Sequence, residues 1–223
     1  MKNNFKKLSM IAISSFILLS GCIEAKAQNN VSVSKTDPIL VELNKLTLKE
    51  KIGQMMIAGF DGTTSSNADT LLKNYKLGGV ILFGTNIKSP SQLVNLTNDI
   101  KTYNKNNKVP LFISVDQEGG RVNRMPSAVL NTPSARTIGN KNNMQYAYNI
   151  GNMISKELSS FGFNTDFSPV FDIQSNPKNT VIGDRSFGTN SSIVSNIGIG
   201  MMDGIHNGNT IPVIKHFPGH GDT

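Results

Sequence analysis

The chain has 223 residues, a formal net charge of +7, one cysteine and no tryptophan. A single cysteine excludes an intramolecular disulfide. Three of the positive charges fall in the first 21 residues, which leaves a mild balance of about +4 for the rest. Because these charges are scattered and no basic stripe is interleaved with aromatic residues, the composition argues against nucleic acid as a partner.

The first 21 residues have the pattern of a secretory signal peptide. Lysines at positions 2, 6 and 7 precede a mostly apolar run over residues 8–19, which is too short to span a bilayer comfortably. The run ends in Leu19-Ser20-Gly21-Cys22, which resembles the lipobox of bacterial lipoproteins. In those proteins the signal is cut before the cysteine, and the thiol carries diacylglycerol. The alternative is an ordinary signal followed by an incidental cysteine.

The next segment, residues 22–37, is polar and has no apolar period, so we expect a flexible tether. Lipid on Cys22 would hold the following domain, residues 38–223, on the outer face of a membrane. That domain is long enough to bury a substantial core.

From residue 38 onward, helix and strand signals alternate. A capping box at Thr47-Leu48-Lys49-Glu50 predicts one helix start, and an N-cap serine followed by proline at Ser89-Pro90 predicts another. The predicted strands are short apolar runs at 55–60, 78–83, 110–115, within 163–171, and at 211–214. The predicted helices between them span 68–75, 91–103, 143–160 and 191–205.

Short apolar strands separated by helices indicate a parallel sheet that is buried on both faces. An open doubly wound nucleotide-binding sheet would carry a glycine fingerprint after its first strand, and Asp61-Gly62-Thr63-Thr64 does not match it. Polar residues instead follow strand after strand, at Asp61, Asn86, Asp116, Asp172 and Lys215. Polar residues at the ends of successive strands are typical of a (β/α)8 TIM barrel. The sequence therefore predicts an α/β fold with about the first five units of such a barrel.

Three stretches concentrate ionisable residues at predicted strand ends. The first, over residues 114–124, reads SVDQEGGRVNR. Its Asp116 is placed to accept hydroxyl hydrogen bonds from a sugar, and the alternative is a solvated loop with internal salt bridges. For Glu118, beside two glycines that allow a tight turn, we expect a role in ordering that turn.

The second stretch, residues 165–188, places Asp166 and Asp172 on either side of the fourth strand. Its long loop carries Arg185, whose guanidinium suits bidentate recognition of an oxygen-rich ligand. Long loops on a barrel rim are usually functional. For Asp172, ordering the loop and contacting a ligand directly are equal alternatives.

The third stretch, residues 211–223, reads IPVIKHFPGHGDT. His216 and His220 are four residues apart, a spacing that would suit a metal only on a helix. Pro218 and Gly219 break any helix here, so we expect no metal. Lys215 and His216 fit better as adjacent donors to a sugar.

Taken together, these stretches resemble glycoside hydrolase family 3, and within it the β-N-acetylhexosaminidases. The matching pieces, in the family's order, are KIGQMMIAGF, GGVILF, SVDQEGGRVNR, GFNTDFSPVFDI, IGDRSFG and IPVIKHFPGHGDT. The form KHFPGHG points to the hexosaminidase branch. The resemblance implies no cofactor, and it implies an N-acetylglucosamine ring bound by Asp116, Arg124, Arg185, Lys215 and His216.

The resemblance further implies retaining removal of terminal, non-reducing β-linked N-acetylglucosamine from a glycan or muropeptide. In the family an aspartate attacks the anomeric carbon, and an aspartate-paired histidine acts as acid and then as base. That histidine belongs to an Asp-Ser-His triplet a few residues beyond KHFPGHG, and the nucleophile follows later. Both are expected beyond Thr223, so we expect no catalytic residue within residues 1–223 and an inactive chain.

Two other functions stay open at this point. One is a sugar-binding lipoprotein that has lost catalysis. The other is a different member of the same family, such as a β-glucosidase or a glycosyl phosphorylase.

Replacing Cys22 by serine tests the lipid anchor. We expect the wild-type protein to fractionate with membranes and the Cys22→Ser protein to leave them, because serine lacks the thiol that carries the lipid. Immunoblots of fractionated cells measure this difference. Equal membrane association of the two proteins would rule the anchor out.

Overall fold

The computed structural model describes residues 37–107 and 109–221, in which helices and strands alternate. In chain order they are α1 Pro38–Lys45, α2 Leu48–Gln54, β1 Ile57–Gly59, α3 Ser66–Tyr75, β2 Gly79–Leu82, the 3-10 turn η1 Gly84–Asn86, α4 Pro90–Asn104, β3 Phe112–Val115, α5 Ala135–Asn140, α6 Met144–Ser160, β4 Thr165–Asp166, the 3-10 turn η2 Gly183–Arg185, α7 Ser191–Asn207 and β5 Ile211–Pro212. The predicted signal peptide, Cys22 and the tether up to residue 36 lie outside the described residues.

Local capping groups explain where several helices begin. Thr47 and Glu50 form the predicted capping box at the start of α2, and Ser89 caps α4 ahead of its N1 proline. Asp37 accepts a hydrogen bond from Ile39 N at 2.8 Å and so caps α1, a helix that the sequence patterns did not predict. None of the helices in the described ranges is both long and apolar enough to cross a bilayer.

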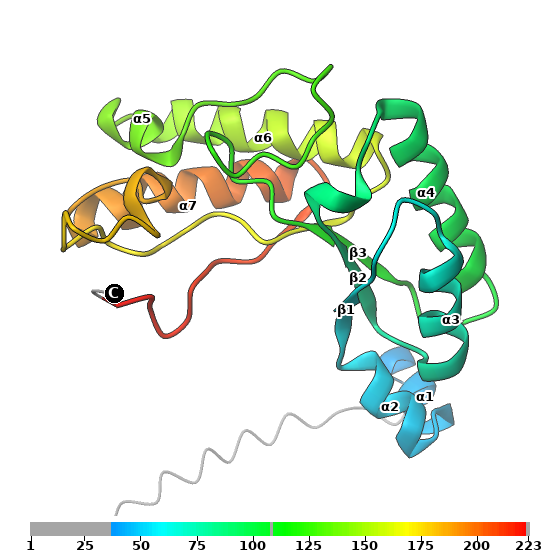
Figure 1. Cartoon of the computed structure of the whole chain (residues 1–223). Coiled ribbons are helices and arrows are strands. Elements are labelled where there is room, and N and C mark those ends of the chain that lie inside the picture. Colours follow the sequence, from blue (N-terminus) through cyan, green and yellow to red (C-terminus); the bar gives the residue numbers. More distant parts are fainter. Residues whose placement is uncertain (1–36, 108, 222–223) are drawn as a thin grey trace, which may run out of the picture.

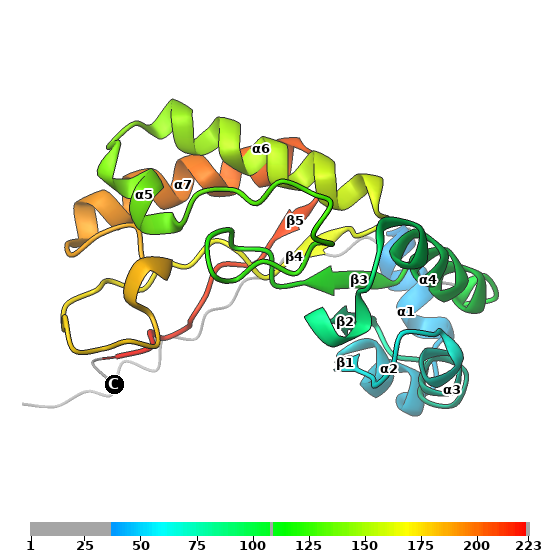
Figure 2. The same ribbon diagram turned by 45° about the horizontal axis from the view of Figure 1, so that its top comes forward.

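The five strands form one parallel sheet in the order β1-β2-β3-β4-β5, so each strand pairs with the next along the chain. The connecting helices α3, α4, α6 and α7 follow one another around the outside of the sheet (Figures 1 and 2). A doubly wound sheet would instead reverse its strand order and carry helices on both faces. Sequential order with an outer row of helices is the arrangement of a barrel.

The core lies between the sheet and these helices. Val80 pairs in register with Ile113, and Leu82 pairs with Val115; all four side chains are at most 1% exposed. Burying an aliphatic side chain of this size is worth about 1.5–3 kcal/mol. The opposite face of the sheet is more open, and Phe112 on that face is 41% exposed.

Helices α6 and α7 lie side by side over one end of the sheet (Figure 1). A Cβ on Gly204 would stand 2.1 Å from the carbonyl oxygen of Tyr148, and one on Gly151 would stand 2.3 Å from that of Met201. Glycine is therefore required at both positions for the two helices to approach this closely.

Strands β4 and β5 have only two residues each and are shorter than the sequence predicts. Pro212 lies in β5 opposite Asp166, and backbone pairing continues past it, because Val213 N donates to Asp166 O at 2.8 Å. Farther along the same two segments, Val170 bridges Lys215 and Phe171 N donates to Lys215 O at 2.7 Å. Lys215 is thereby fixed at the carboxyl edge of the sheet.

Asn86, one of the polar residues predicted at a strand end, is fully buried and structural. Its Oδ1 accepts a hydrogen bond from Phe83 N at 2.8 Å, and its Nδ2 donates to Phe60 O at 2.9 Å and Gly62 O at 2.7 Å. Asn86 therefore ties the loop after β1 to the loop after β2.

Candidate functional site

Charged side chains meet at the carboxyl edge of the sheet. Asp116 directly follows β3 and Lys215 follows β5, with β4 between the two strands. Lys215 Nζ lies 2.7 Å from Asp116 Oδ1 and 2.5 Å from Glu118 Oε1. Asp116 and Lys215, both expected after strands, therefore meet at the same edge of the sheet.

Glu118 is the centre of this cluster. Its side chain is 4% exposed, and Arg185 donates to it twice, from Nε to Oε2 at 2.8 Å and from Nη2 to Oε1 at 2.9 Å. The sequence predicted only a turn-ordering role for Glu118. In the structure its carboxylate binds two cations, one from the β4–α7 loop and one from the end of β5, because the sheet brings these segments together.

Burial and ion pairing shift the pKa values of Glu118 and Arg185. Burial raises the pKa of Glu118, but the hydrogen bond from Arg185 and the nearby charge of Lys215 together outweigh it, so this pKa is lowered overall. The hydrogen bond to Glu118 raises the pKa of Arg185. Glu118 and Arg185 are therefore both charged, and the two carboxylates of the cluster balance its two cations.

A fully buried carboxyl, Asp166, lies behind the cluster. Its Oδ1 accepts a hydrogen bond from Gln117 N at 2.9 Å, and its Oδ2 has no partner among the described residues. Burial raises the pKa of Asp166 well above its ordinary value, despite the hydrogen bond from Gln117 and the charge of Lys215. These surroundings favour the protonated, neutral form of Asp166.

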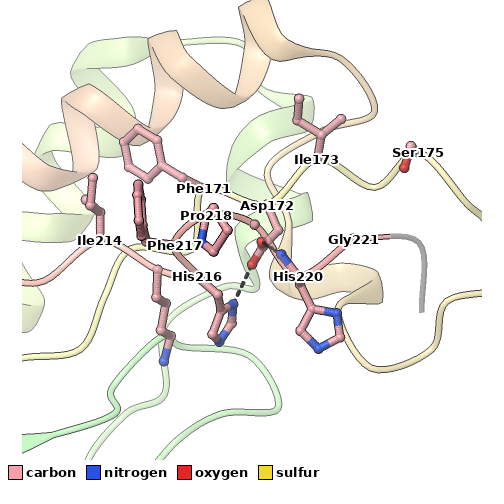
Figure 3. Close-up of a pocket in the computed structure, with 12 residues that line it drawn as sticks. Phe171, Asp172, Ile173, Ser175, Ile214, His216, Phe217, Pro218, His220 and Gly221 are labelled. Carbon is pink, nitrogen blue, oxygen red and sulfur yellow. Dashed lines mark hydrogen bonds and ion pairs between the residues drawn. The ribbon is translucent and has the colours of Figure 1, made fainter. Parts of the chain in front are cut away.

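Asp172 holds the loop that follows β5. His216 Nδ1 lies 2.5 Å from Asp172 Oδ2, and His220 N donates to Asp172 Oδ1 at 2.7 Å (Figure 3). Asp172 therefore orders this loop, which was one of the two alternatives left by the sequence, and it also lines the cavity beside the loop. Within residues 37–107 and 109–221, no group of three or more His, Cys, Asp or Glu side chains is placed to hold a metal ion.

A cavity of about 600 Å³ opens beside the two histidines (Figure 3). Its volume falls in the usual range for small-molecule sites. The wall combines the polar groups of Lys215, His216 and Asp172 with the apolar side chains of Phe171, Ile173 and Phe217.

Arg124 is held by the same loop but makes no ion pair among the described residues. Its backbone N donates to Gln117 Oε1 at 2.8 Å, and its Cδ packs 3.9 Å from where a Cβ on Gly84 would stand. Its Nε is buried and has no hydrogen-bond partner in the described structure. The structure thus brings Asp116, Arg185 and Lys215 into one network, joins His216 to Asp172, and leaves Arg124 with an unused donor.

Sequence reasoning missed Glu118 as an ion-pair centre and Gln117 as a link. Gln117 binds Asp166 through its backbone and Arg124 through its side chain. The available signal was Asp166 itself. The sequence pattern placed it beside the fourth strand, but the structure places it inside β4, where a buried carboxyl requires a hydrogen-bond donor. The identity of that donor depends on strand pairing and could not be read along the chain.

Removing the charge of Glu118 should strongly destabilise the fold. In Glu118→Gln, Lys215 and Arg185 lose their shared buried carboxylate, and breaking a buried pair costs about 3–5 kcal/mol. Glu42→Gln is the matched control, since Glu42 pairs with Lys45 at 2.6 Å on an exposed helix face, where such a pair is worth about 0–1 kcal/mol. Urea unfolding at neutral pH measures both, and equal losses would contradict the central place of Glu118.

Asp166 should make stability depend on pH. Because its folded pKa is raised, the stability that its proton contributes is complete below the pKa of the unfolded chain and is lost as pH rises towards the folded pKa. Asparagine does not titrate. As pH rises above about 4, the ordinary pKa of aspartate, the free energy of unfolding of Asp166→Asn should therefore improve relative to wild type, by at most about 1.4 kcal/mol per pH unit. A difference that stays constant with pH would show that Asp166 is ionised in the folded protein.

Comparisons with known proteins agree with this architecture. Residues 47–223 match the glycosyl hydrolase family 3 N-terminal domain. Among curated relatives, beta-hexosaminidase A of Pseudoalteromonas piscicida is 38% identical over 159 residues, which are 69% of this chain and 27% of that protein. A beta-hexosaminidase of Nitrosomonas eutropha is 37% identical over 177 residues, which are 76% of this chain and 49% of that protein. The chain therefore spans between about a quarter and a half of these relatives' length.

Solved structures give the same result. A family 3 beta-N-acetylglucosaminidase from Paenibacillus superposes with a TM-score of 0.76 at 38% identity, over 80% of this chain and 34% of that one. NagZ from Neisseria gonorrhoeae, in complex with N-trifluoroacetyl-D-glucosamine, superposes with a TM-score of 0.67 at 31% identity, over 74% of this chain and 50% of that one. With the family match and the sequential parallel sheet, these similarities show that the chain belongs to glycoside hydrolase family 3 and carries part of that family's TIM-barrel-like N-terminal domain.

Proposed function

We propose that this chain forms the sugar-binding part of a β-N-acetylhexosaminidase that removes terminal, non-reducing β-linked N-acetylglucosamine with retention of configuration. The observation that carries the proposal is the balanced cluster of Asp116, Glu118, Arg185 and Lys215 at the carboxyl edge of the sheet. The family supports the proposal, because relatives with 32–38% identity are named beta-hexosaminidase or beta-N-acetylglucosaminidase.

The cluster leaves hydrogen-bonding capacity for a ligand. Asp116 Oδ1 is taken by Lys215, whereas no hydrogen bond among the described residues reaches Oδ2, and the side chain is 22% exposed. Oδ2 accepts a sugar hydroxyl in this proposal. An ammonium has three donors, and Lys215 directs two of them to Asp116 and Glu118, so the third serves a ligand oxygen.

His216 and Arg124 complete the proposed sugar site. Asp172 occupies Nδ1 of His216, which leaves Nε2 to face a hydroxyl. The buried Nε of Arg124 lacks a partner, and a buried donor normally finds one. A ligand oxygen would satisfy it.

Binding of the ground state does not by itself accelerate hydrolysis. The family resemblance assigns the acid/base to a histidine paired with an aspartate, and the nucleophile to a second aspartate, all later in the sequence than the Lys215-His216 motif. We propose that these groups lie beyond Thr223 and that residues 1–223 alone are inactive. The proposed mechanism uses neither a metal nor an organic cofactor.

The proposed location is outside the cytoplasm, on a membrane, through lipid on Cys22. The basic start, the apolar run and the Leu-Ser-Gly-Cys ending support it. A substrate at that location is a glycan or muropeptide that contains N-acetylglucosamine.

An activity assay on two proteins tests the function. We expect the protein extended beyond Thr223 to hydrolyse a chromogenic N-acetyl-β-glucosaminide and residues 1–223 to show no turnover, since loss of acid/base help alone costs a factor of about 10² to 10⁴. Asp116→Ala in the extended protein should lower kcat/KM about 100-fold, because a hydrogen bond to a charged group is worth about 1.5–3 kcal/mol. Lys178→Ala, an exposed charge on the long loop, should not.

Three results would contradict parts of the proposal. Comparable turnover by residues 1–223 would place the catalytic groups within this chain. An extended protein that cleaves a β-glucoside and ignores the N-acetylglucosaminide would belong to another branch of the family. An extended protein that binds N-acetylglucosamine without turnover would be a sugar-binding lipoprotein.

A further inference from the structure

Arg121 joins two loops of the site from outside the charged cluster. Its Nη2 donates to three successive carbonyl oxygens, those of Thr180 at 3.0 Å, Val181 at 2.7 Å and Ile182 at 2.9 Å. Its Nε lies 2.9 Å from Asp184 Oδ1. One guanidinium thus holds the turn that spans these residues of the β4–α7 loop.

The backbone from which Arg121 extends is itself fixed. Gly119 has a φ of +82°, and a Cβ there would stand 2.3 Å from Thr132 Oγ1. Gly120 N donates to Thr132 O at 2.9 Å, and Val122 N donates to Gly119 O at 3.1 Å. Because this tight turn packs against Thr132, the backbone of Arg121 is held in a defined position.

The segment that Arg121 holds leads directly to Arg185. Arg185 N donates to Ile182 O at 2.9 Å, and Gly183 between them has a φ of +48°. Beyond this turn the Arg185 side chain reaches Glu118. Two residues of the β3–α5 loop, Glu118 and Arg121, therefore hold the side chain of Arg185 and the backbone just before it.

We propose that Arg121 is a positioning residue for substrate binding, which holds residues 180–184 so that Arg185 faces the sugar. This inference rests on the proposed function. Arg121 and its partner Asp184 are 45% and 49% exposed, whereas Arg185 and Glu118 are 16% and 4% exposed. Arg121 therefore lies on the outer side of the loop and acts through Arg185.

The shape of the arginine side chain explains why residue 121 can bind the carbonyls of residues 180–182 and Asp184 at once. A planar guanidinium presents several N–H donors in fixed directions, so it can reach adjacent carbonyls and a carboxylate together. A lysine ammonium is a single point charge on a flexible stem. Arg121→Lys should therefore restore only part of the effect of losing Arg121.

A double-mutant cycle in the protein extended beyond Thr223 separates positioning from general stabilisation. Arg121→Ala should raise KM for the chromogenic N-acetyl-β-glucosaminide about tenfold and change kcat less than about threefold, from the size of charged hydrogen bonds. In a protein that already carries Arg185→Ala, adding Arg121→Ala should change KM less than about twofold. Lys178→Ala, which removes an exposed charge from the same loop, is the matched control.

Binding of N-acetylglucosamine by calorimetry provides a readout without turnover and should weaken about tenfold in Arg121→Ala. If that variant does not fold, Arg121→Lys and Asp184→Asn take its place in the cycle. Additive effects of Arg121 and Arg185, or an unchanged KM in folded Arg121 variants, would overturn the inference while the proposed function stands. A wild-type protein that neither binds nor cleaves would instead reject the proposed function, and this inference with it.

Discussion

The site depends on one buried carboxylate that two cations share. Glu118 is almost fully buried and binds Arg185 twice and Lys215 once. Removing a carboxylate from water costs several kcal/mol unless it is well paired. The β4–α7 loop and the end of β5 must therefore bring both cations to the β3–α5 loop before this carboxylate can be buried.

The parallel sheet brings Glu118 and its two cations together, and backbone pairing beyond β4 and β5 fixes the position of Lys215. Consecutive parallel strands place all their carboxyl ends on one edge. Beyond β4 and β5 the two segments stay paired, through Val213 N to Asp166 O at 2.8 Å and the bridge between Val170 and Lys215, which fixes where the Lys215 side chain leaves the sheet. Burial raises the pKa of Asp166 and so disfavours a third negative charge behind the two carboxylates of the cluster.

In the proposed function, this network binds the sugar and takes no part in the chemical step. Every charged group in it is held by another group of the chain, so the surface proposed to bind a sugar is preorganised and loses little freedom when a ligand arrives. Outside it, the exposed Arg121 holds the loop that carries Arg185. In the proposal, the acid/base and nucleophilic groups come from a different part of the domain than the sugar-binding cluster.

The sequence by itself determined the alternation of helices and strands, the barrel-type order and the residues at strand ends, because periodicity and capping are local properties. It also placed Asp116 and Lys215 together, since parallel strands share an edge. It missed α1 and the six-residue α5, whose patterns are too short for a clear period. Only the tertiary structure decided what Glu118 does, because its partner Arg185 is 67 residues away in the chain. Strand register and loop packing decide which cations reach a buried carboxylate, and neither can be predicted from the residues next to it in the sequence.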